Sequence, residues 1–109
     1  KVAHHQEERL AADALEIGEA LTYLANCYKS LKEYNDAIKH YDEAIEVFRA
    51  CYGNDHNHNT AVAIGNIGLV YKDLGKVKEA REYLNLGKKI LKDLYGEECP
   101  DYQYFNEQL

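Results

Sequence analysis

Apolar residues recur at intervals of three and four along most of the chain, which is the spacing of one face of an α-helix. The first series lies between positions 17 and 31, and the second lies between positions 37 and 51. A polar break at Lys32 separates the two, and Gly53 follows the second series in a place where glycine often ends a helix. The pattern therefore predicts two helices joined by a short turn. The series consist of Leu21, Leu24, Tyr28 and Leu31, then Ala37, Tyr41, Ala44, Ile45, Phe48 and Cys51.

The same pattern occurs a second time, 43 residues further along the chain. The segment YKSLKEYNDA, which begins at Tyr28, matches the segment YKDLGKVKEA, which begins at Tyr71. A fixed period of about 20–50 residues indicates that copies of one supersecondary unit stack on each other. The sequence thus predicts an all-α fold of stacked antiparallel helix hairpins, a fragment of an α-solenoid. Further matched pairs are Leu21/Ile64, Leu24/Ile67, Ala25/Gly68, Leu31/Leu74, Tyr34/Val77, Ala37/Ala80, Tyr41/Leu84 and Ala44/Gly87.

Small residues mark the places where the paired helices are expected to touch. Ala25 and its equivalent Gly68 lie on the first helix of each unit, and a small side chain there lets two helices approach closely. The turn between helices favours a left-handed residue, which Gly75 adopts easily and its equivalent Lys32 adopts at a higher energy. Gly87 stands where the repeat has alanine, and we expect it to weaken its helix by about 1 kcal/mol.

Together these residues resemble the tetratricopeptide repeat, and the period of 43 residues is similar to the longer repeats of kinesin light chains. The resemblance implies a superhelical stack with two units, residues 17–58 and residues 59–100. Residues 1–16 would form an N-terminal helical cap or the tail of a preceding repeat. Residues 101–109 would begin a further helix. Asn57 departs from the family pattern, because the longer repeats often carry proline there, as the next loop does at Pro100.

The resemblance also implies that the first helices line a concave groove with the face that carries no core residues. Asn26 and Asn66 fall where peptide-binding members of the family place asparagines. A side-chain amide both donates and accepts hydrogen bonds, so it can hold an extended peptide backbone of any sequence. The face consists of Glu19, Thr22, Tyr23, Asn26, Lys29 and Ser30 in one unit and Val62, Gly65, Asn66, Leu69, Lys72 and Asp73 in the other.

Four other residues of this face have two interpretations each. Tyr23 and Leu69 either form an apolar pocket for a ligand side chain or pack between neighbouring units. Lys29 and Lys72, which are equivalents, either attract an acidic ligand or only keep the surface soluble. Thr22 occupies the place of the lysine that clamps a terminal carboxylate in some family members, so a chaperone tail is a poor candidate ligand.

Charge and composition exclude several classes of function. The formal net charge of −6 would repel nucleic acids, and no apolar run approaches the roughly 20 residues that a membrane helix needs. The three cysteines form no CxxC pair, which is typical of reduced thiols, so we expect a cytoplasmic location. His56 and His58 lie in a polar loop, and no cysteine stands at a metal-like spacing from them.

The sequence carries no P-loop, no G-x-G-x-x-G motif and no nucleophile turn, so we expect neither catalysis nor a cofactor. The absence of methionine suggests a piece of a longer protein. The favoured function is a protein–protein interaction scaffold that binds a peptide segment. Two alternatives stay open, namely a structural spacer or self-association module, and a regulatory or sensory domain of a larger protein.

Overall fold

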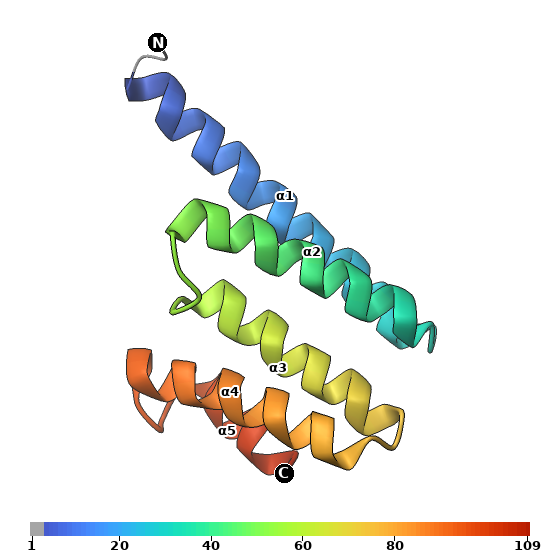
Figure 1. The fold of residues 1–109 in the computed structure, drawn as a ribbon. Helices are drawn as coiled ribbons and strands as arrows, with labels where there is room; N and C mark the ends of the chain where they lie inside the picture. The colour runs from blue at the N-terminus through green and yellow to red at the C-terminus, as the bar shows by residue number, and fades with distance from the viewer. Residues whose placement is uncertain (1–3) are drawn as a thin grey trace.

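In a computed structural model, which describes residues 4–109, these residues form helices and no strand. Helices that follow one another in sequence also lie next to one another in space and run antiparallel (Figure 1). The predicted all-α fold of stacked helix hairpins is confirmed. The helices are α1 (His4–Ser30), α2 (Tyr34–Tyr52), α3 (His58–Asp73), α4 (Val77–Tyr95) and α5 (Pro100–Glu107).

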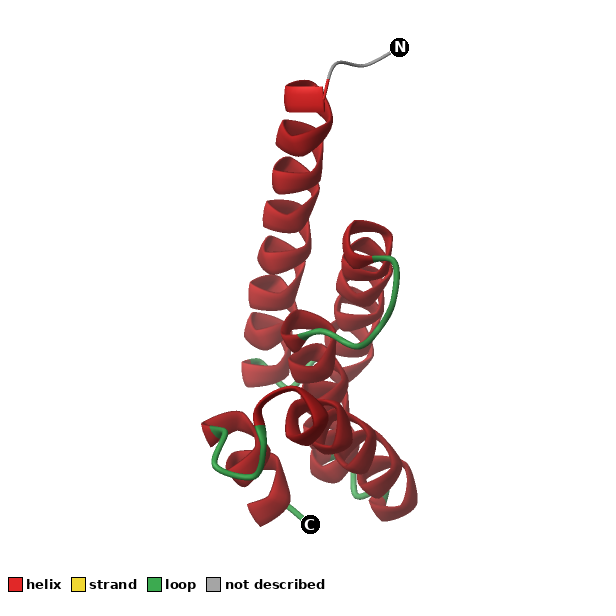
Figure 2. Ribbon diagram, turned by 90° about the vertical axis from the view of Figure 1, so that its left-hand side faces the viewer, coloured by secondary structure: helices red, strands yellow, loops and turns green. Residues whose placement is uncertain are grey.

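The first and last segments of the chain extend this stack. Residues 1–3 of the predicted segment 1–16 lie outside the described residues, and the remainder forms the first half of α1, which is a single helix of 27 residues. This half of α1 extends beyond the other helices (Figure 2). Residues 101–109 contain most of α5, which packs against α4.

Helices α1 and α3 end in the same way. The amide of Glu33 donates to the carbonyl of Tyr28 at 2.9 Å, and the amide of Lys76 donates to that of Tyr71 at 2.9 Å. This bond pattern needs a left-handed residue, and Lys32 supplies it with a φ of 62° where the second unit has glycine. A left-handed conformation raises the energy of a non-glycine residue by about 1–2 kcal/mol. Both turns therefore share one backbone conformation, with a φ of 62° at Lys32 and 77° at Gly75, and the predicted difference is the higher energy at which lysine adopts it.

Small residues hold the paired helices together, as the repeat predicts. Ala25 and Ala37 are fully buried between α1 and α2. A Cβ atom added to Gly68 would lie 2.8 Å from Leu84 Cγ, closer than packed side chains allow. The Ala25/Gly68 position is therefore the contact point of both helix pairs.

Gly87 is also a contact point. A Cβ atom there would lie 2.8 Å from the carbonyl oxygen of Ala61 and 3.0 Å from the amide nitrogen of Gly65, both on the backbone of α3. From the sequence we expect Gly87 only to weaken its helix. The structure adds a reason for glycine, because any side chain would push α4 away from α3.

The predicted core face of α1 is wrong in part. Leu24 is 42% exposed, whereas its equivalent Ile67 is fully buried in α3. The reason is the neighbour: α3 lies between α2 and α4, while no described helix covers this side of α1 (Figure 1). Burial of this position depends on the preceding helix as much as on the residue itself. Leu10, Ile17, Leu24 and Leu31 form this exposed apolar stripe, which we call the α1 stripe.

The starts of α3 and α5 differ where the family pattern differs. The side chain of Asn57 caps α3 by accepting a hydrogen bond from the amide of Thr60 at 2.8 Å. Its equivalent Pro100 instead occupies the first turn of α5, where the missing amide of proline causes no loss. Asparagine and proline therefore start the first helix of a unit in two different ways, by capping it or by occupying its first turn.

Candidate pocket between the first helices

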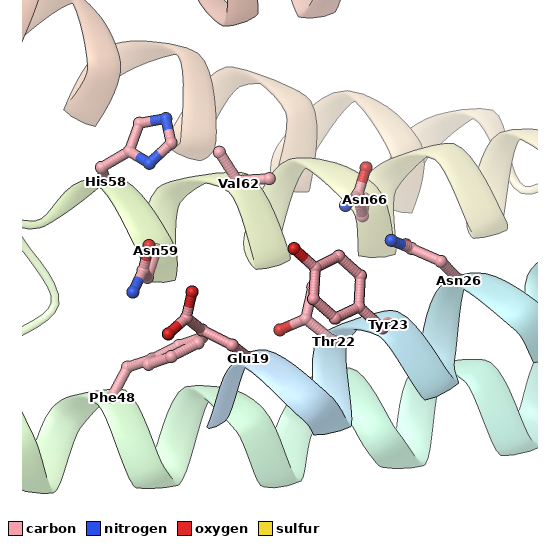
Figure 3. A pocket seen from close by; sticks show the side chains of 9 residues that line it. All are labelled: Glu19, Thr22, Tyr23, Asn26, Phe48, His58, Asn59, Val62 and Asn66. Atoms are coloured by element: carbon pink, nitrogen blue, oxygen red, sulfur yellow. The ribbon is translucent and has the colours of Figure 1, made fainter. Parts of the chain in front are cut away.

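A pocket of about 200 Å³ lies between α1 and α3 (Figure 3). Its walls come from the two first helices, and the ring of Phe48 reaches it from α2. The lining residues are Glu19, Thr22, Tyr23, Asn26, Phe48, His58, Asn59, Val62 and Asn66.

Three of the six predicted site residues meet in this pocket. The side chains of Tyr23, Asn26 and Asn66 point toward one another across the junction (Figure 3). Tyr23 is 68% exposed, so its ring stands free at the edge. Periodicity alone would not pair Asn26 with Asn66, because they are not repeat equivalents. They meet because α1 and α3 lie side by side.

The other three predicted residues do not line this pocket. Leu69 is only 5% exposed and belongs to the hydrophobic core, which agrees with its second interpretation. Lys72 Nζ donates to the side-chain oxygen of Gln108 at 3.2 Å, and Lys72 lines a separate space of about 130 Å³ with Arg81. Lys29 is partly buried and lies outside both spaces.

Asn26 has a structural partner that the sequence did not indicate. The hydroxyl of Tyr41 donates a hydrogen bond to the side-chain oxygen of Asn26. Tyr41 is fully buried, and burial raises the pKa of its phenol above the usual value. A buried tyrosine hydroxyl normally needs a partner, so a tyrosine in the core face of α2 was the available signal. The amide nitrogen of Asn26 stays available to a ligand.

The floor and walls of the pocket combine an aromatic ring with few charges. Phe48 is 1% exposed, so the rest of its ring is packed in the core. No lysine or arginine is among the lining residues, and Glu19 contributes a carboxylate. Glu19, Thr22 and Val62 lie on the predicted groove face. Phe48, His58 and Asn59 were missed, because they come from the second helix and from the very start of α3.

The corresponding space between α3 and α5 is filled. Phe105, the equivalent of Val62, is 2% exposed and packs its ring against Gly65. Gly65 is the equivalent of Thr22, and a Cβ atom on it would overlap the ring of Phe105. One junction between first helices is therefore open and the next one is closed.

Both histidines that were expected in a loop contact carboxylates on later helices, although only His56 lies in the loop and His58 is the first residue of α3. His58 Nε2 lies 2.9 Å from Asp101 Oδ2, and His56 Nε2 lies 3.7 Å from Asp93 Oδ2. Within residues 4–109, no group of three histidine, cysteine or acidic side chains is placed to hold a metal ion. Over the same range, no helix has the length and apolar character needed to span a membrane.

The chain is similar to known proteins both in its sequence profile and in its fold. A family profile described as Tetratricopeptide repeat matches residues 16–93. The crystal structure of BtubC (BKLC) from P. vanneervenii is similar with a TM-score of 0.74 and 19% sequence identity. This likeness covers 95% of the chain and 45% of BtubC, so the chain spans less than half the length of that protein. No curated protein matched the chain. At this identity the structural match shows the fold alone.

Proposed function

Because the chain belongs to the tetratricopeptide repeat family, whose repeats are generally protein-interaction modules, we propose that it binds an extended peptide segment of a partner protein in the pocket between α1 and α3. The observation that carries this proposal is the meeting of Asn26 and Asn66 at one pocket. Two amides from the first helices of successive units can contact successive peptide groups of an extended chain, while side-chain pockets supply selectivity.

The two asparagines would contribute differently. The side chain of Asn66 has no hydrogen-bond partner among the described residues, so its amide offers both a donor and an acceptor. Asn26 offers its donor, because its oxygen accepts from Tyr41. Removing Asn26 would leave a buried hydroxyl unpaired and weaken the fold. Asn66 is therefore the position at which binding and stability can be separated.

In this proposal the protein acts as a scaffold in the cytoplasm and catalyses no reaction. Members of the family are typically non-enzymatic scaffolds. All three cysteines are free in the structure, which fits a reducing compartment.

The test is Asn66→Ala in a selection of displayed random peptides. We expect Asn66→Ala to weaken the peptides selected on the unchanged protein by roughly tenfold, which corresponds to one or two lost hydrogen bonds. Asn85→Ala is the matched control, because Asn85 is exposed on α4 and does not line the pocket. Helical content by circular dichroism should be the same in all three proteins. Equal affinities for the two variants would refute the role of Asn66.

A second candidate function, self-association, is favoured by the α1 stripe. Leu10 is 59% exposed and Leu31 is 68% exposed, and the stripe repeats every seven residues, as in helices that pair with one another. Sedimentation velocity over a concentration series separates the candidates. Self-association predicts a sedimentation coefficient that rises with protein concentration, and Leu24→Ser should abolish that rise. A peptide receptor predicts a constant monomer value.

A further inference from the structure

The pocket between α1 and α3 has a distinctive electrostatic character. Among its lining residues the carboxylate of Glu19 is the one acidic group, and lysine and arginine are absent. Glu19 has no ion-pair partner among the described residues. The one basic side chain in the lining is His58, and its Nε2 already lies 2.9 Å from Asp101 Oδ2. The formal net charge of the whole chain is −6. The field at this pocket therefore favours a cation.

The pocket also has an accessible aromatic surface near that carboxylate. Tyr23 supplies this surface, because its ring is 68% exposed, whereas Phe48 on the floor is only 1% exposed. Figure 3 shows the carboxylate of Glu19 beside Phe48, with the ring of Tyr23 further along the pocket. A planar guanidinium stacks on aromatic rings and binds a carboxylate through two parallel hydrogen bonds. Asn59 donates its amide to Tyr52 at 3.4 Å, so its side-chain oxygen is free to accept a further bond. An ammonium group would use the charge of Glu19 but could not stack on the flat ring of Tyr23.

We propose that this pocket receives an arginine side chain of the partner segment, with Glu19 as its counter-ion. This inference rests on the proposed function, since it names the residue that the bound segment carries. It also argues against the interpretation in which Lys29 and Lys72 attract an acidic ligand, because both lie outside this pocket and Lys72 donates to Gln108. An acidic side chain would meet an unpaired carboxylate of the same sign.

The test uses three small probes, namely the N-acetyl methylamides of arginine, citrulline and glutamate. Citrulline has the shape of arginine without its charge. Titrations are followed by the side-chain amide NMR signals of Asn26 and Asn66. We expect the arginine probe to shift both signals saturably and to bind roughly fivefold more tightly than citrulline, as for a partly exposed ion pair. The glutamate probe should bind least.

Two charge-neutralising variants sharpen this test. Glu19→Gln should remove the preference for arginine over citrulline. Glu46→Gln removes the same charge from an exposed position on α2, outside the pocket, and should keep the preference. Equal binding of the arginine and citrulline probes to the unchanged protein would overturn the proposal. Equal loss in both variants would overturn it as well, because the preference would then come from net charge.

Peptide selection distinguishes failure of this inference from failure of the proposed function. If selected peptides lack arginine yet lose affinity in Asn66→Ala, the groove binds peptides and the arginine assignment is wrong. If the arginine probe binds as expected and no displayed peptide is enriched, the chemistry of the pocket is right and peptide binding is wrong.

Discussion

The two junctions between successive first helices share a register and differ in packing. Between α1 and α3 the facing residues are Thr22 and Val62, and a pocket of about 200 Å³ remains. Between α3 and α5 the equivalent residues are Gly65 and Phe105, and the phenylalanine ring fills the space. The volumes of two side chains therefore decide whether a junction is filled or open. Protein interiors are closely packed, so a large ring fills the space that smaller side chains leave for a ligand.

Polar contacts distinguish the closed junction further. Lys88 Nζ donates to Asn106 Oδ1 at 3.0 Å, and Lys72 Nζ donates to Gln108 Oε1 at 3.2 Å. These bonds are exposed, so each contributes little alone. They join α5 to α3 and α4, and burial of the Phe105 ring, which is 2% exposed, adds hydrophobic stabilisation.

The largest expected effect comes from opening the closed junction. Phe105→Ala should lower the free energy of unfolding by about 3–5 kcal/mol, because it removes a buried ring and leaves a cavity beside Gly65. Chemical denaturation measures the change, and hydrogen exchange should show loss of protection first in α5. Tyr104→Ala is the matched control, since Tyr104 is 49% exposed on the same helix. A loss no larger than that of the control would contradict the packing role of Phe105.

A smaller effect is expected where the two units end their first helices. Lys32→Gly should raise the free energy of unfolding by about 0.5–1 kcal/mol, because it relieves a left-handed lysine but adds flexibility to the unfolded chain. Gly75→Ala, at the equivalent turn, should lower it by about 1 kcal/mol. Thermal unfolding of both variants gives the comparison. A destabilised Lys32→Gly would mean that the lysine side chain makes a favourable contact that outweighs its backbone strain.

Much of the fold follows from the sequence because each helix pair is specified by nearby residues, and the same pattern occurs in both units. The spacing of apolar residues and the small residues at Ala25 and Gly68 specify the helix pairs. Gly75 and Lys32 mark the turns, because the end of a helix depends on a few adjacent residues. The exposure of Leu24 does not follow, since burial at this position requires a further helix against that face, as α2 provides for α3.

The pocket could be predicted only in part. Asn26, Asn66 and Tyr23 were found because they lie on the face opposite the core. The bond from Tyr41 to Asn26 and the floor formed by Phe48 depend on how α2 sits beneath α1, which periodicity does not encode. Leu69 has the groove position of Asn26 in the next unit, yet it is buried, because equivalent positions have different neighbours at the two junctions.

The most direct measurement closes the open junction with the residues of the closed one. Val62→Phe combined with Thr22→Gly reproduces Phe105 and Gly65 between α1 and α3, and Val62→Phe alone covers the case in which the added glycine weakens α1. Affinity for peptides selected on the unchanged protein is measured by isothermal titration calorimetry, with helical content checked by circular dichroism. If the pocket binds the partner segment, both variants stay helical and lose affinity by at least roughly tenfold. Unchanged affinity in a folded variant would show that the peptides bind elsewhere.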